Sequence, residues 1–219
     1  MAVSGYSDSL DLLSDGSGSF TAPPYYNGAF STGSIQFLHS SGNIQRTGTG
    51  WGSFAWGTQF GPDSILGVLV AQAGEMELEI RGKDMGGANW DAYSLYYDNS
   101  GGWELYRTVN GSPSAALATA SSVTPAVGDM IAFMALGSGA TVSIAAAIKS
   151  GGSWGADFLT YDDTNAARLV NSGYIGAWAN GTTFKINELY GGDASPNSGG
   201  GGGSSSVFVP TKMLMGVGI

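Results

Sequence analysis

The sequence contains no cysteine and a single histidine, His39. The absence of cysteine excludes disulfides, zinc sites built on thiolates and cysteine nucleophiles. His39 stands alone within a segment that has the pattern of a strand, so acyl-transfer chemistry lacks its usual general base. We therefore expect no thiol or imidazole chemistry, and no cofactor.

Basic residues are also scarce. The 219 residues include 8 Lys and Arg against 17 Asp and Glu, which gives a formal net charge of −9 at pH 7 and a pI near 4.2. Proteins that bind nucleic acid do so through clustered Lys and Arg side chains, because these neutralise the phosphates. No such cluster is apparent, so nucleic acid is excluded as an expected partner.

Long apolar segments are missing as well. No segment approaches the ~20 consecutive apolar residues of a transmembrane helix. The first residues, MAVSGYSDSLDLLSDG, lack both the basic and the apolar region of a signal peptide. The sequence thus predicts a soluble protein that is made in a cytoplasm and has no membrane partner.

The sequence is rich in glycine, with 37 residues, and in aromatic residues, which make up 11%. Its clearest local signal lies in residues 90–111, where two aromatic-rich segments, 93–97 and 103–109, flank Asp98-Asn99-Ser100-Gly101-Gly102. Aromatic segments around a cluster of turn-forming residues predict a β-hairpin. A hairpin is only marginally stable in water, so it requires a larger sheet.

Other short segments with strand patterns supply that sheet. Their spacing of roughly 8–12 residues is typical of sandwiches and barrels. They are residues 35–39, 51–60, 64–71, 75–81, 115–120, 130–136, 141–148, 174–178 and 183–190. Helical patterns are almost absent. The sequence predicts an all-β fold with two antiparallel sheets.

Composition divides the chain into four parts. Residues 1–24 form an N-terminal arm or a loosely attached first strand that ends at Pro23-Pro24, and residues 25–193 form the sandwich domain. Residues 194–206 include five consecutive glycines and three serines, which predicts a flexible linker. Residues 207–219 are an apolar tail.

The tail is too short to fold alone. We expect its apolar side chains to dock on a partner protein, with a fold-back onto its own sandwich as the alternative. The expected docking residues are Val207, Phe208, Val209, Met213, Leu214 and Met215. The segment Val207–Val209 can add as an edge strand to a partner sheet.

Three stretches carry a resemblance to a known superfamily. They are residues 93–120 with LYRTVNG, residues 127–145 with a Gly-Asp turn and GSGATV, and residues 172–193 with GYIG and a last strand. Their order resembles the concanavalin A-like, laminin-G-like jelly-roll superfamily over about residues 60–193. The resemblance implies a jelly-roll sandwich, a fold that lectins, glycanases, lyases and adhesion modules share. A Gly-rich segment followed by a short hydrophobic end resembles virion proteins of tailed bacteriophages.

Glu75, Glu77 and Glu79 alternate with Met76, Leu78 and Ile80, so the acids share one strand face. Glycanases of this fold carry such a row, with one carboxylate as nucleophile and another as general acid. Under that alternative Glu75 and Glu79 are catalytic. However, the middle residue is Glu instead of Asp, and the flanking aromatic pattern is missing. We therefore interpret the row as a solvated strand face and expect no catalytic residue.

Asp162 and Asp163 are candidate calcium ligands, because lectins of the resembled superfamily often bind Ca²⁺ through acidic oxygens. Adjacent acids on a loop are usually just solvated. The last strand carries Asn187-Glu188 where the superfamily often has Asp. We accordingly expect no metal site.

Tryptophans near turns offer flat faces on which sugar rings can stack. The candidates are Trp90, Trp103, Trp154 and Trp178. Tryptophan also fills the cores of sandwiches, since aromatic side chains bury the most area. Ligand contact and core packing remain the two alternatives for each of them.

Together these observations predict a non-catalytic virion protein, either a capsid decoration or a tail appendage, anchored by its C-terminal peptide. Its expected partners are other virion proteins, with surface glycans as a further candidate and a homo-oligomer left open. The two alternatives are a glycoside hydrolase or other glycan-active enzyme, and a free lectin-like carbohydrate-binding protein.

Overall fold

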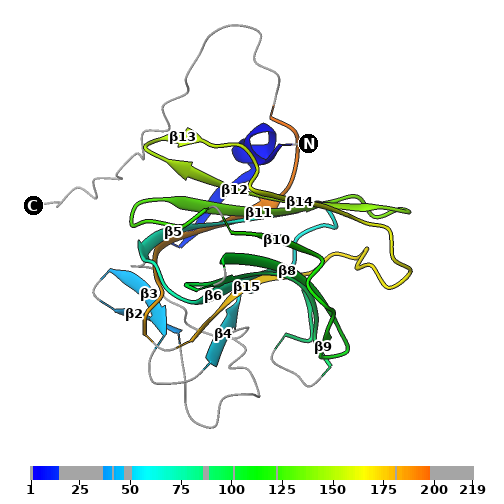
Figure 1. Cartoon of the computed structure of the whole chain (residues 1–219), viewed down its shortest axis with the longest axis horizontal. Helices are drawn as coiled ribbons and strands as arrows, with labels where there is room; N and C mark the ends of the chain where they lie inside the picture. The colour runs from blue at the N-terminus through cyan, green and yellow to red at the C-terminus, as the bar shows by residue number, and fades with distance from the viewer. Residues whose placement is uncertain are drawn as a thin grey trace, which may run out of the picture.

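The computed structural model describes residues 2–14, 37–40, 42–46, 51–85, 89–100, 102–121, 123–180 and 182–197. Two antiparallel sheets pack face to face and form a sandwich (Figure 1). The predicted all-β, two-sheet jelly-roll class is confirmed. No helix in the described part of the chain is long and apolar enough to cross a membrane.

One sheet has nine strands, and its main path runs β13-β12-β11-β5-β16-β3-β2, with β1 paired to β16 and β14 paired to β12. Its strands are β1 (Asp11–Ser14), β2 (Phe37–Ser40), β3 (Asn43–Arg46), β5 (Ser64–Gln72), β11 (Met130–Leu136), β12 (Val142–Ser150), β13 (Ser153–Trp154), β14 (Leu159–Asp163) and β16 (Lys185–Asp193).

The other sheet has seven strands and runs β10-β8-β7-β6-β15-β4, with β9 paired to β8. Its strands are β4 (Trp51–Ala55), β6 (Met76–Lys83), β7 (Asp91–Asp98), β8 (Gly102–Val109), β9 (Ser112–Pro113), β10 (Ala118–Ala120) and β15 (Tyr174–Asn180). The predicted hairpin is β7–β8, in which Asp98 lies opposite Gly102. Gly102 has a φ of 92°, a conformation that favours glycine.

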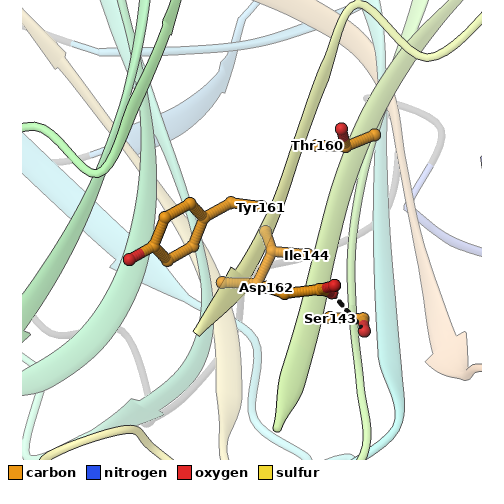
Figure 2. A pocket seen from close by; sticks show the side chains of 5 residues that line it. All are labelled: Ser143, Ile144, Thr160, Tyr161 and Asp162. Carbon is orange, nitrogen blue, oxygen red and sulfur yellow. Dashed lines mark hydrogen bonds between the residues drawn. The ribbon is translucent and has the colours of Figure 1, made fainter. Parts of the chain in front are cut away.

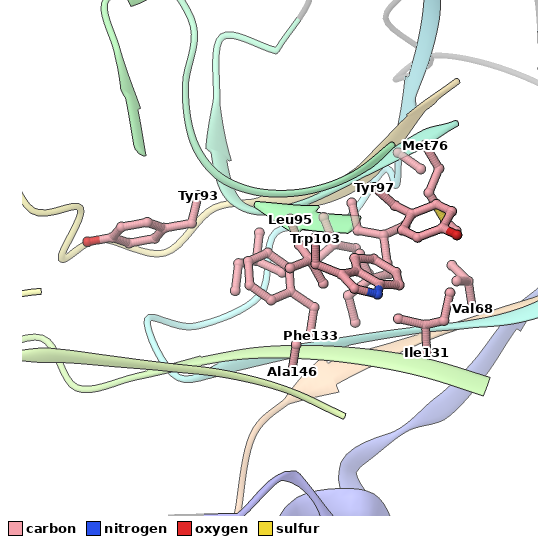
Figure 3. Close-up of a cluster of buried hydrophobic side chains, with 14 of the residues drawn as sticks. Val68, Met76, Tyr93, Leu95, Tyr97, Trp103, Ile131, Phe133 and Ala146 are labelled. Carbon is pink, nitrogen blue, oxygen red and sulfur yellow. The ribbon is translucent and has the colours of Figure 1, made fainter. Parts of the chain in front are cut away.

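The core lies between the inner faces of the two sheets (Figure 3). Trp103 and Phe133 are both fully buried there and come from opposite sheets. The Trp103 ring packs 4.8 Å from Tyr97 and 5.0 Å from Phe158, measured between ring centroids. Its Nε1–H donates to the Val123 carbonyl at 2.8 Å, so its polar atom is satisfied.

The N-terminal segment covers the outer face of the nine-stranded sheet. A 3₁₀ helix, η1 (Val3–Ser9), packs there, and Figure 1 shows it on the side away from the seven-stranded sheet. Val3 is fully buried among small side chains such as Ala132, Ala145 and Ala147, which let η1 approach the sheet closely. Asn197, at the C-terminal end of the described residues, donates its backbone N–H to the Gly5 carbonyl.

A buried ion pair connects the two sheets. Arg107 of β8 donates to Asp163 of β14 at 2.6 Å, and the Tyr93 hydroxyl of β7 donates to the same carboxylate oxygen at 2.7 Å. The Asn165 backbone N–H donates to the other oxygen of Asp163 at 3.0 Å. The carboxylate is fully buried, so these donors replace its hydration.

The structure also differs from the predicted strand map. The strands β3, β9, β13 and β14 are not among the predicted ones, and β4 ends at Ala55 instead of reaching Phe60. The first strand that is an alternative for residues 1–24 is present as β1, paired to β16. Asp162 and Asp163, predicted to lie on a loop, belong to β14, because residues 159–163 pair with β12. The predicted boundaries at residues 24 and 206 lie outside the described residues.

Candidate functional site

The outer face of the seven-stranded sheet carries a row of glutamates beside a row of tyrosines. Met76, Leu78 and Ile80 point into the core, so the alternate residues of β6 point outward. Glu77 lies opposite Tyr96 of β7, which in turn lies opposite Glu104 of β8. The hairpin register therefore alternates acids and aromatic rings across the sheet.

This face of the sheet has a groove with a volume of about 340 Å³. Pockets that bind small ligands have volumes of roughly 300–1,000 Å³. Its six lining residues come from β6, β7, β8, β9 and the segment before β7. They are Glu77, Trp90, Tyr96, Tyr106, Thr108 and Pro113. A ligand that enters this groove therefore meets aromatic side chains and one carboxylate.

Hydrogen bonds hold both tyrosines of the groove in place. The Tyr96 hydroxyl donates to Glu75 at 2.5 Å, and the Tyr106 hydroxyl donates to Glu104. Partial burial, reinforced by the hydrogen bond to Glu104, raises the pKa of Tyr106 to about 12, and burial with the bond to Glu75 raises the pKa of Tyr96 further. Both hydroxyls stay protonated and their protons are already donated, so toward a ligand they are acceptors.

Two of the four candidate tryptophans meet at one end of this face. The rings of Trp90 and Trp178 lie 5.6 Å apart between centroids, and both are largely buried. Trp178 donates its Nε1–H to Glu79 at 2.6 Å. Trp90 also lines the groove, so it is the candidate that the structure places at the site.

Glu79 corrects the interpretation of the glutamates as a solvated face. Its side chain has no exposed surface, whereas Glu75 and Glu77 are half-buried. Burial, and secondarily the negative charge of Glu77, raises the pKa of Glu79 well above its usual range. The physical reason is the bulky Trp178, which comes from β15 beside β6 and bonds to the carboxyl group.

The enzyme alternative needs Glu75 and Glu79 to reach one substrate. In the structure the Glu75 carboxylate accepts the Tyr96 hydroxyl, and Glu79 is fully buried. A general acid without exposed surface does not reach a glycosidic oxygen. This arrangement therefore does not present the two carboxylates as an open catalytic pair.

The other two tryptophans lie elsewhere. Trp103 is fully buried in the core, so of its two alternatives the structure shows core packing, and it has no surface to offer a ligand. Trp154 lies half-buried on β13 of the opposite sheet, where the Lys149 ammonium stands 5.9 Å from its ring centroid. It lines a separate depression of about 300 Å³ together with Ser7 and Tyr190.

The two calcium candidates point in opposite directions from β14. Asp162 is exposed and accepts a hydrogen bond from the Ser143 hydroxyl at 2.6 Å (Figure 2). Asp163 points inward and is held by Arg107 and Tyr93. In the described part of the chain, no group of three or more His, Cys, Asp or Glu is placed to hold a metal ion. The pair therefore does not converge on one cation.

The docking residues Val207, Phe208, Val209, Met213, Leu214 and Met215 lie outside the described residues, so their role stays a prediction.

Sequence reasoning missed Tyr96, Tyr106, Thr108 and Pro113 as groove residues. Tyr96 and Tyr106 belong to the predicted hairpin, and the alternation of its strands would have placed them on the face opposite Trp103. The missing information was which face is the outer one. That is decided by the second sheet, which packs over Trp103.

No protein-family model matches the chain, and no curated protein matches it. Solved structures match it as a lectin-like jelly-roll sandwich. A protein of unknown function with a galectin-like fold from Bacillus subtilis has a TM-score of 0.55 at 10% identity, over 74% of this chain and 87% of that chain. The exoplasmic/lumenal domain of VIP36 in its Ca²⁺/Man2-bound form has a TM-score of 0.54 at 14% identity, over 85% of this chain and 90% of that chain. At these identities the similarity shows the fold alone.

Proposed function

We propose that this protein is a non-catalytic carbohydrate-binding module whose ligand occupies the groove on the seven-stranded sheet. The observation that carries the proposal is the groove itself, where the rings of Tyr96 and Tyr106 and the small exposed part of Trp90 lie beside the carboxylate of Glu77. Flat aromatic surfaces with a few fixed polar groups suit sugar rings, which have apolar faces and polar edges. The fold is shared with the VIP36 domain, whose structure carries Man2, and this supports the same class of ligand.

A glycan panel tests this proposal. The wild-type chain should bind at least one glycan class, and Trp90→Ala should weaken that binding by about tenfold or more, because it removes a wall of the groove. Trp154→Ala is the matched control, since it removes a tryptophan from the opposite sheet. Thermal unfolding of both variants checks that each is folded. A wild-type protein that binds no glycan, or a loss of binding in Trp154→Ala alone, contradicts the proposal.

A second proposal concerns display on a virion, with the C-terminal residues as the anchor. The groove lies on the outer face of the seven-stranded sheet, whereas Asn197 contacts η1 on the outer face of the nine-stranded sheet. Asn197, the last described residue, therefore lies on the side of the sandwich away from the groove. A capsid or tail protein bound on that side would leave the groove free, which supports a display role.

Truncation after Asn197 tests the display proposal. The cut must spare Ser195 and Asn197, because they bond to Ser9, Asp8 and Ser4. The truncated chain should unfold at the same temperature and bind glycans as before, but it should no longer co-sediment with particles. Truncated protein that still joins particles would show that the tail is not the anchor.

A further inference from the structure

The polar atoms that the groove offers to a ligand are dominated by acceptors. The Tyr96 and Tyr106 hydroxyls have already donated their protons to Glu75 and Glu104. Glu77, once ionised, has only acceptor oxygens. The six lining residues include one acid and neither lysine nor arginine. A ligand that fits must therefore bring hydrogen-bond donors.

Charge on this face favours the same kind of ligand. Glu75 and Glu104 lie beside the groove on the same outward face as Glu77. Glu77 and Tyr106 both line the groove. A ligand with a positive charge would be attracted to Glu77 and would lie over three aromatic faces, where cation–π attraction adds to the pairing.

We infer that the groove selects glycans whose sugars carry a free, protonated amine. This inference rests on the proposed glycan binding and adds the chemical class of the ligand. An ammonium group brings three donors and one positive charge to a groove that is rich in acceptors and negative charge. An N-acetylated amine keeps one donor and no charge, and it adds a carbonyl that needs a donor. A hydroxyl likewise brings one donor and no charge.

Three oligosaccharides that differ in one substituent test the inference. Oligomers of glucosamine, N-acetylglucosamine and glucose with the same linkage (fragments of chitosan, chitin and cellulose) are titrated into the full chain by calorimetry at low salt. The titrations cover several pH values from mildly acidic to neutral, because burial raises the pKa of Glu77 and the amine pairs only with its ionised form. The glucosamine oligomer should bind about tenfold or more tightly than the other two, as expected for one charge-assisted contact. Its advantage should shrink as salt is added.

Variants locate the selectivity. Glu77→Gln should abolish the preference for the amine, because it keeps the shape of the side chain and removes its charge. Asp162→Asn changes the net charge of the protein by the same amount, but Asp162 lies on the opposite sheet. This variant should therefore keep the preference for the amine. A lysine oligomer of the same length carries the amines without sugar rings. Equal affinity for the lysine and glucosamine oligomers would overturn the inference, since it would mean attraction to an acidic protein and nothing more.

The remaining outcomes separate this inference from the proposed function. Equal affinity for all three oligosaccharides, reduced by Trp90→Ala, overturns amine selectivity and leaves glycan binding intact. If none of the three oligosaccharides binds but another glycan on the wider panel does, amine selectivity is likewise overturned and glycan binding stands. No binding to any glycan overturns both.

Discussion

Asp163→Asn should lower the free energy of unfolding by about 3–5 kcal/mol, the range measured when one partner of a buried ion pair is removed. The Asp163 carboxylate is fully buried and receives hydrogen bonds from Arg107, Tyr93 and the Asn165 backbone N–H. Asparagine keeps the volume but leaves the Arg107 guanidinium, itself nearly buried, without a counter-charge. Because Arg107 and Asp163 belong to different sheets, the loss weakens the contact that holds the sandwich closed.

The neighbouring acid provides the control. Asp162→Asn makes the same chemical change one residue away, at an exposed carboxylate that bonds only to Ser143 among the described residues. It should change the free energy of unfolding by less than about 0.5 kcal/mol. Urea unfolding of the two variants measures the difference. A loss in Asp163→Asn as small as that in Asp162→Asn would mean that the buried pair contributes little.

The dependence of stability on pH gives an independent test of the Arg107–Asp163 pair. Burial alone raises the pKa of Asp163, but the bonds from Arg107, Tyr93 and Asn165 outweigh it and leave the pKa below its ordinary value. A lowered pKa in the folded state contributes stability above the ordinary Asp pKa, and that stability is lost as the pH falls through the folded-state value. The wild-type chain should therefore lose stability in this acidic range more steeply than Asp163→Asn does.

Local patterns were sufficient for much of the fold. Residues 130–136 form β11 with the bounds that their apolar run predicts. This strand is paired on both sides, with β5 and β12, so its whole apolar run is used in the sheet. The hairpin β7–β8 was also predictable, since its turn residues lie directly between its aromatic segments. β14 was not, because it exists only through its pairing with β12, and Asp162-Asp163 alone suggests a loop.

The site was harder to predict than the fold, because burial on an outer face depends on distant residues. Alternation placed Glu77 and Glu79 on one face correctly, yet Glu79 is buried by Trp178, 99 residues later in the chain. Trp90 and Trp103 look alike in the sequence, as each lies next to a turn. Only the position of the second sheet distinguishes Trp103 as a core residue from Trp90 at the groove.

Glu79→Gln should raise the free energy of unfolding at neutral and alkaline pH by about 1–3 kcal/mol, because it removes a carboxylate whose charged form has no water to solvate it. One oxygen of Glu79 accepts the Trp178 Nε1–H, and the side chain has no exposed surface. Glutamine keeps an acceptor for Trp178 and removes the charge that Glu77 repels. Glu79→Ala should do the opposite and destabilise, because it leaves the indole N–H unpaired and a cavity beneath the ring.

The pH dependence of the free energy of unfolding shows whether the charge of Glu79 causes the difference between the wild-type chain and Glu79→Gln. Burial and the charge of Glu77 raise the pKa of Glu79 in the folded state, so the folded chain holds a proton that the unfolded chain releases. Stability from this group is complete below the ordinary Glu pKa and is lost as the pH rises through the raised value. The advantage of Glu79→Gln should consequently be absent at acidic pH and grow as the pH increases. Urea unfolding across that range measures it, with Glu188→Gln on the other sheet as the control. An advantage that is constant with pH would mean that shape, and not charge, separates the two side chains.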